Sequence, residues 1–415
     1  MEAIKTLINN KDIRGKILFT IMMLFLFRVL SFIPVPFVNR EVLKTISSSG
    51  ILNYASTFTG GALSNFTIMA TGISAYISAS IIIQLLTYAI QALHDVQKSP
   101  GGDKIIKRYT VIVGVIMAFV ISIGTTITMQ NIYGILTNPV WYVYLLIATI
   151  HSIGTGLAVW IGETITQKGF GNGVSLLIFI NIISSIPSLL NNTLKDISAG
   201  RLIWYYGLLV LFLLVVVLIS IVISESSARK IPIQYSKASA RGATSFGQSQ
   251  NYFPIKVNLT GVMPIIFAST IMQIVSMASQ YAPEKIASFL TKYLSYGSIM
   301  YAIIMSVLIF MFSYFYSALI FDPKEISDNI QSNGGCIPGI RPGKPTGDYI
   351  RQVNKNLTFI GAMYLSLIAL IPTIIFSAIG FNGLATTSMM ILVGVSLETC
   401  QKIKVETKSR IYKTF

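Results

Sequence analysis

The residues able to perform acid–base, nucleophilic or metal chemistry are few, and almost all of them lie outside the apolar stretches of the chain. No aspartate falls inside such a stretch, and the nearest glutamates, Glu163 and Glu398, stand at stretch ends. The sequence shows no metal-ligand spacing, no Gly-x-Ser-x-Gly elbow and no phosphate-binding glycine loop. Enzymes and ion-coupled transporters within membranes keep ionisable groups at depth. The pattern therefore predicts a conduit without catalytic residues, metal or cofactor.

One histidine and one arginine lie well inside apolar stretches. We expect His151 to pack through a hydrogen bond, with a proton relay as the alternative. We expect Arg28 to bond to backbone carbonyls or to extend toward the membrane interface.

Membrane-spanning helices are the elements that must position these residues. The chain is 53% hydrophobic and 11% charged, whereas soluble domains are about 25% charged. Crossing a bilayer takes about 20 apolar residues. Ten segments meet or nearly meet this need: 16–37, 69–93, 109–130, 141–162, 174–190, 202–224, 257–279, 299–321, 357–379 and 385–400. We predict an all-α polytopic membrane protein whose first stretch is a span and not a signal peptide.

The positive charges predict the orientation. With both termini in the cytoplasm, 24 of the 31 lysines and arginines fall on the cytoplasmic side and 6 in outer loops, as the positive-inside rule requires. The net charge of +16 thus reports topology and not nucleic-acid binding. Cys336 and Cys400 fall on the reducing side, so we expect no disulfide.

The ten spans predict two halves. Five is an odd number, so the second half enters the membrane from the opposite side, as in inverted repeats. We assign residues 1–190 to the first half, 191–201 to an outer hinge loop, 202–400 to the second half and 401–415 to a cytoplasmic tail.

Three segments between the spans have unusual composition. Segment 57–67, TFTGGALSNFT, is too short to cross the membrane and leads directly into the second span. We predict a re-entrant pore element, with an interfacial helix as the alternative. The loops 225–256 and 322–355 are long and basic, and we predict that the second presents a docking tip, with a solvated connector as the alternative.

Several blocks of sequence resemble the SecY family of protein-translocation channels over nearly the whole chain. In chain order they are FRVLSFIPVP, FTGGALSNFTIMATGISAYISASIIIQLL, WIGETITQKGFGNGVSLLIF, RKIPIQYSK, NYFPIKVNLTGVMPIIFAS, GGCIPGIRPGKPTGDYI and IALIPTIIF.

The resemblance implies an hourglass channel in the inner (cytoplasmic) membrane. Its waist would be a ring of apolar side chains, from here on called the ring residues: Ile73, Ile77, Val174, Ile178, Ile266 and Ile391. Segment 57–67 would be the family's plug, and its central residues would be Phe58, Gly60, Gly61, Ala62 and Leu63. A lateral gate into lipid would open between the second and third spans and the seventh and eighth, with polar contacts from Gln84, Ser269 and Thr270.

The resemblance also implies partners. The basic loops would dock the ribosome or the SecA ATPase through Arg229, Lys230, Arg241, Arg341 and Lys344. The other expected partners are the small membrane subunits SecE and SecG, preproteins that carry signal sequences, and membrane lipid.

Three alternatives remain at this point. Ser74, Ala75, Ser64 and Asn65 depart from the family's usual residues, which leaves open an accessory channel for specialised substrates. A secondary transporter would need a carboxylate at mid-membrane, and a membrane enzyme would need a nucleophile with its base or a metal.

Overall fold

The computed structural model describes residues 11–39, 41–43, 59–198, 204–235, 251–278, 290, 293–294, 298–379 and 386–411. Within these ranges, a long helix coincides with each of the ten predicted spans. The ten helices are α2 (Lys11–Leu30), α5 (Gly72–Ala89), α7 (Gly102–Tyr133), α8 (Trp141–Lys168), α9 (Gly173–Ser198), α10 (Trp204–Ser226), α11 (Met263–Ala278), α13 (Ile299–Ile320), α15 (Lys344–Ile379) and α16 (Thr386–Ile411).

The composition of these helices explains why they span a membrane. In the described part of the chain, six helices are long and apolar enough to cross a membrane by length and composition alone. Helices α9 and α11 have shorter apolar portions, Gly173–Pro187 and Met263–Val275. Helix α13 has 22 residues, or about 33 Å at 1.5 Å per residue, which matches a hydrocarbon core of about 30 Å.

Some helix ends differ from the predicted span ends. Helix α2 ends at Leu30 and not at residue 37, because Pro34 and Pro36 follow and disfavour helical backbone before them. The second span stops at Ala89, where Ile90 is extended, and a short amphipathic helix, α6 (Gln91–Lys98), follows it.

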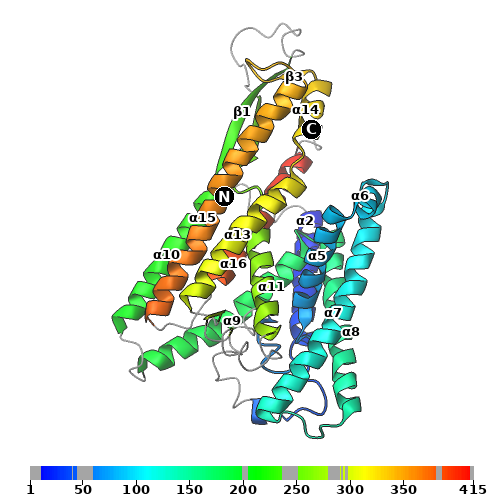
Figure 1. The fold of residues 1–415 in the computed structure, drawn as a ribbon, viewed down its shortest axis with the longest axis vertical. Coiled ribbons are helices and arrows are strands. Elements are labelled where there is room, and N and C mark those ends of the chain that lie inside the picture. Colours follow the sequence, from blue (N-terminus) through cyan, green and yellow to red (C-terminus); the bar gives the residue numbers. More distant parts are fainter. Residues whose placement is uncertain are drawn as a thin grey trace.

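The helix packing repeats with a period of five spans. In the first half α7 packs on α8 and α5, α2 on α8 and α9, and α9 on α5 and α8. Each of these pairs has its counterpart five spans later: α13 packs on α15 and α11, α10 on α15 and α16, and α16 on α11 and α15. This correspondence supports two five-helix halves related by an inverted repeat. The halves meet where α5 packs on α11 and where α9 packs on α16 and α10. Figure 1 shows α2, α5, α7 and α8 beside the helices of the second half, with α9 running below the latter.

A small antiparallel sheet joins the two long loops beyond the ends of the spans. Strand β1 (Ala228–Tyr235) pairs with β2 (Asn251–Lys256) and with β3 (Gly335–Cys336), in the order β2-β1-β3. Together with α14 (Pro323–Ser332), this sheet lies at one end of the molecule, shown at the top of Figure 1. We call the sheet, α14 and the first turns of α15 the cap. The strands were not predicted from the sequence, and residues 236–250 of the first loop lie outside the described residues.

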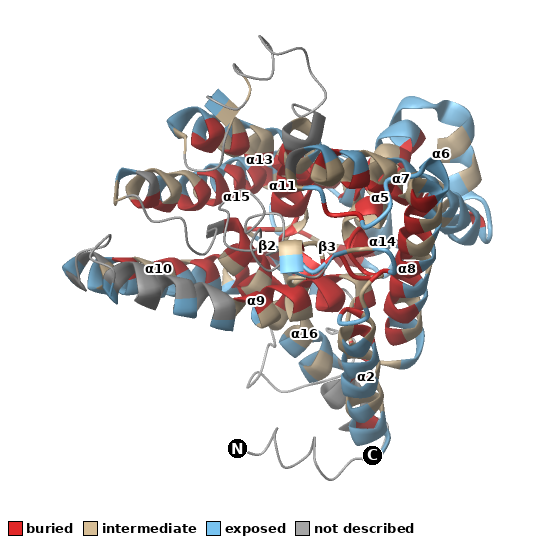
Figure 2. Cartoon of the chain, turned by 90° about the horizontal axis from the view of Figure 1, so that it is seen from below, coloured by how far each residue is buried: buried red, intermediate tan, exposed pale blue. Residues whose placement is uncertain are grey.

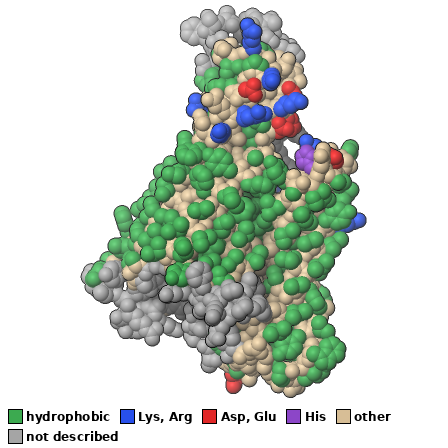
Figure 3. All heavy atoms as spheres, in the orientation of Figure 1, with side chains coloured by type: hydrophobic (Ala, Val, Ile, Leu, Met, Phe, Trp, Pro, Cys, Tyr) green, Lys and Arg blue, Asp and Glu red, His purple; other side chains and the backbone are tan. Residues whose placement is uncertain are grey.

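The cap has an apolar core of its own. Side chains from both loops and from the start of α15 form one buried cluster: Ile231, Ile233, Ile255, Phe321, Ile330, Ile337, Ile350, Val353 and Leu357. Farther along the same helix, Leu365, Ile368 and Ala369 belong to the main core between the spans. Helix α15 therefore connects the cap to the membrane domain without interruption. Figure 3 shows apolar side chains covering the span region, while Lys and Arg gather around the cap.

Candidate functional site

The ring residues come together in one apolar cluster. Ile73 on α5, Ile178 on α9, Ile266 on α11 and Ile391 on α16 are each 5% exposed or less. Ile77 and Val174 are partly buried and pack against the same cluster. Seen from below, buried residues gather at the centre, where these helices meet (Figure 2). The same four helices form two of the contacts between the halves, α5 with α11 and α9 with α16, so the cluster lies at the seam between the halves.

The predicted plug forms a compact series of turns beside this cluster. Phe58 lies outside the described residues, and residues 60–66 are turns and not a membrane-crossing helix. Gly60 and Gly61 have φ values of 63° and 84°, a region that disfavours other residues. Ala62 is 1% exposed and belongs to the main core with the ring residues, while Leu63 is partly buried.

Arg28 contacts the predicted plug directly. Its Nη1 donates a hydrogen bond of 3.2 Å to the backbone oxygen of Gly60, and its guanidinium lies 5.1 Å from the centre of the Phe32 ring. The expectation that Arg28 bonds to a backbone carbonyl is therefore confirmed. Composition could not show which carbonyl, because the partner comes from 32 residues further along the chain.

His151 has a packing role, as expected. The imidazole is 1% exposed, its Nδ1 lies 2.6 Å from Ser122 Oγ, and its ring centre lies 5.4 Å from that of Phe66, the residue that ends the plug turns. His151 thus fixes α8 against α7 and the base of the plug.

The structure brings together three of the four helices of the predicted gate, and its three polar side chains each bond within their own helix. Helix α5 packs on α11, and Tyr88 of α5 meets Phe315 of α13 edge to face at 5.5 Å. Gln84 donates to Ser80 on its own helix. The hydroxyls of Ser269 and Thr270 both donate to the backbone oxygen of Ile266. Their role at a gate stays a prediction.

The basic residues of the predicted docking surface lie on the cap. Arg229 and Lys230 are exposed on β1, Arg341 and Lys344 are exposed where α15 begins, and Arg241 lies outside the described residues. Backbone contacts hold the loop: Thr346 Oγ1 donates to the oxygen of Arg341 (2.9 Å), and Ser327 Oγ donates to that of Gly343 (2.8 Å). The side chain of Arg341 is thus exposed on a loop whose backbone is held by other residues.

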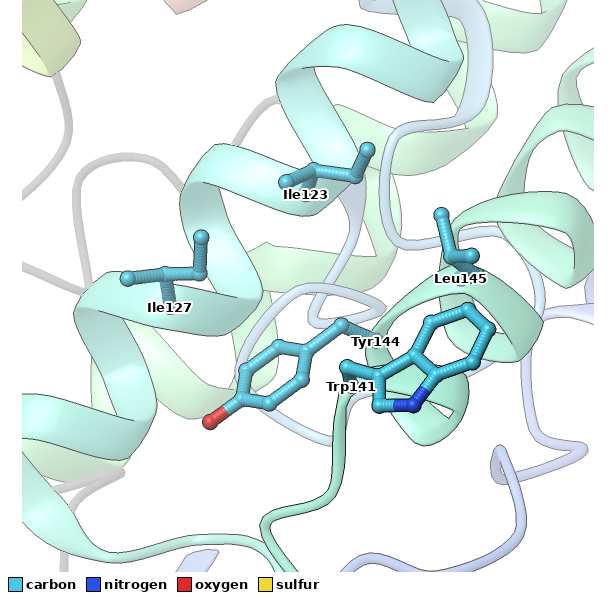
Figure 4. A pocket seen from close by; sticks show the side chains of 5 residues that line it. All are labelled: Ile123, Ile127, Trp141, Tyr144 and Leu145. Atoms are coloured by element: carbon cyan, nitrogen blue, oxygen red, sulfur yellow. The ribbon is translucent and has the colours of Figure 1, made fainter.

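Neither of two surface cavities coincides with the ring. The first, of about 400 Å³, is lined by Ile123 and Ile127 of α7 and by Trp141, Tyr144 and Leu145 of α8 (Figure 4). Its apolar lining, with aromatic rings at a helix start, is typical of a surface that faces lipid near an interface.

The second cavity, of about 660 Å³, lies between α2, the turn that joins α8 to α9, and α16. There Lys256 donates to Gln401, and Lys402 pairs with Glu398 at 2.9 Å. Within the described ranges, no three His, Cys, Asp or Glu side chains are placed to hold a metal.

Known proteins share this architecture along the whole chain. One similar solved structure is a SecY channel from work on how the plug domain stabilises the closed state of the translocation channel. It superposes with a TM-score of 0.67 at 18% identity, covering 94% of this chain and 92% of the other. The Sec61 channel in a canine ribosome-channel complex superposes with a TM-score of 0.66 at 19% identity, with the same coverage. The fold is thus that of the SecY and Sec61 channels, with ten helices in two halves.

Sequence comparison then identifies the family. Residues 67–400 match the family model described as SecY. The protein translocase subunit SecY of Bacillus licheniformis is 36% identical over 427 aligned residues, which cover 100% of this chain and 99% of the relative. This chain belongs to the SecY family.

Proposed function

We propose that this chain is the protein-conducting subunit of a translocase in the cytoplasmic membrane. It passes unfolded preproteins through the ring and releases apolar segments sideways into lipid. The observation that carries the proposal is the single apolar cluster formed by ring residues from both halves, with the plug packed beside it. A narrow apolar constriction loses its water and so blocks ions, and it offers a sliding chain no hydrogen bond that would hold it.

The lateral exit follows from the contacts between the halves. Ile81 of α5, Phe267 of α11 and Phe312 of α13 belong to one apolar cluster, and the rings of Tyr88 and Phe315 join α5 to α13 edge to face. An apolar signal segment that parts these helices moves from water into hydrocarbon, which is favourable by about 25 cal/mol per Å² of apolar surface. No covalent bond in the substrate changes, so the channel needs no catalytic residue.

The energy for movement comes from a docked partner. The exposed arginines and lysines of the cap suit a surface of carboxylates or RNA phosphates, and arginine binds both through a planar fork of donors. Support for a ribosome as partner comes from the related Sec61 channel, which was solved in a ribosome-channel complex. We propose the SecA ATPase as the second motor and SecE and SecG as membrane partners.

The charges support a cytoplasmic location for the cap and both termini. The cap holds most of the lysines and arginines visible in Figure 3, and α6, from another predicted cytoplasmic loop, lies toward the same end of the molecule (Figure 1). Positive residues favour the cytoplasmic side of a membrane.

Reconstitution tests the function. The chain, assembled with SecE and SecG in lipid vesicles, is supplied with SecA, ATP and a secreted precursor, and translocated precursor is measured as the fraction protected from added protease. We expect protection that requires ATP and disappears when detergent opens the vesicles. A precursor that stays fully accessible, with the channel present at normal amount and orientation, would falsify the proposal.

A further inference from the structure

We propose that Arg28 is the latch that holds the plug in its closed position, and that Asn181 and Ser184 of α9 form the other walls of its seat. The inference rests on the proposed function, because it assigns a role within the closed channel.

Arg28 is a charged residue inside an apolar membrane span. A cation inside an apolar span is costly and is kept for a function. Arg28 is partly buried in the last turn of α2, where the carbonyl end of the helix favours positive charge. The helix end alone does not account for the hydrogen bond to Gly60, which lies in another segment.

The seat of Gly60 is tight. A Cβ added there would lie 2.7 Å from Ser184 Oγ, 2.8 Å from Arg28 Nη1 and 2.9 Å from Asn181 Oδ1. All three are closer than real Cβ contacts come. Three polar side chains from α2 and α9 therefore enclose one backbone unit of the plug. Among the described residues, a Cβ added at the next residue, Gly61, would meet only Asn65 Nδ2, at 3.9 Å.

The plug has a different kind of attachment at its base. Val35 donates its backbone N–H to Phe66 at 3.1 Å, and Ile68 donates to Ile33 at 3.0 Å, so the segment after α2 pairs with the segment after the plug. These backbone bonds form a hinge that can persist while the plug turns swing. Displacing the plug would then break the bond from Arg28 to Gly60 and withdraw Ala62 from the core.

The latch lowers the fraction of channels that are open in the absence of substrate. A hydrogen bond from a charged donor is stronger than a neutral one, and arginine holds its acceptor with fixed geometry. When the latch is lost, we expect the open fraction to rise about 10- to 100-fold, which corresponds to about 1.4 to 2.8 kcal/mol.

Ion current through reconstituted channels without substrate provides the test. We expect Arg28→Met to raise the current, and Arg28→Lys to raise it less because the charge remains. Arg14→Met, which removes an exposed arginine from the same helix, is expected to leave the current unchanged. A second pair of variants does not touch Arg28. Gly60→Ala and Gly61→Ala both strain left-handed backbone, but only Gly60→Ala fills the seat, so it should leak more.

The results separate failure of the latch from failure of the proposed function. Deletion of residues 59–65 serves as the reference for an absent plug. If that deletion leaks while Arg28→Met does not, or if the two glycine variants leak equally, the latch is refuted and the channel function stands. If neither the deletion nor any ring variant changes the current, the proposed function itself fails.

Discussion

Replacing Ile391 by Asn probes the ring most directly. The side chain is 1% exposed and shares its cluster with Ile73, Ile178 and Ile266 from three other helices. Full burial of an isoleucine is worth about 1.5 to 3 kcal/mol, and an amide buried without a partner costs about 1 to 3 kcal/mol. The closed state should therefore lose about 2.5 to 6 kcal/mol.

Water that enters the ring can hydrate the new amide, so most of this loss should favour the open state. At about 1.4 kcal/mol per factor of ten, the open fraction should rise by at least about thirtyfold. The assay is the substrate-free ion current of single channels in a planar bilayer. In parallel, export of a precursor with a defective signal sequence should become detectable.

Two controls define the result. Ile391→Val removes one methyl group and should cost only about 0.5 to 1.5 kcal/mol. Ile350→Asn makes the same polar change in the cap, where the side chain is 0% exposed, and should lower stability without raising the current. An Ile391→Asn channel that conducts no more than the unchanged protein, at equal abundance, would refute the assignment of the ring.

Three further predictions concern topology and the cap. Single cysteines at Asn138 and Lys230, in a background without the native cysteines, should react oppositely with an impermeant thiol reagent added to intact cells, and equal labelling would overturn the orientation. Arg341→Glu should abolish SecA-driven export, because reversing a charge in a desolvated contact costs about 2 to 5 kcal/mol of binding free energy. The amount of channel should not change, since substitutions in exposed loops alter the stability of the fold by about 0.5 kcal/mol or less. Normal export at limiting SecA would show that this loop is not the docking site. Ile233→Ala should destabilise the cap by about 2 to 5 kcal/mol, seen as faster proteolysis of the loops, and equal resistance to protease in this variant and in Gln234→Ala would contradict the packing described.

The spans were predictable from the sequence because each depends on local composition. The sheet was not predicted, although Ile231 and Ile233 alternate with exposed residues as in a strand. Pro232 and Pro254 argued against strands, since proline cannot donate to a ladder. The partner strand β3 begins 100 residues after the end of β1, and nothing local indicates that pairing.

At the candidate site, too, some features could be predicted from the sequence and others could not. From composition alone the ring residues are ordinary core residues, and only the resemblance and their meeting in one cluster single them out. The predicted loop tip contains the start of helix α15 at Lys344. The sequence held a signal for this start, because proline, here Pro345, suits the first turn of a helix. In the structure Gly343, which precedes the helix, has a φ of 94°. The partner of Arg28 depends on tertiary structure and lay beyond any local pattern.

Helix α15 gives the molecule a mechanical property. It carries Ile350 in the cap and Leu365 in the main core on one unbroken backbone, and the two are 15 residues, or about 22 Å, apart. Pro372, which would weaken the backbone, comes only after this stretch. A push or twist delivered to the cap therefore travels along hydrogen-bonded helix to side chains that pack with the ring. If a motor docks on the cap, as we propose, its work would reach the ring residues as a displacement of this stiff helix.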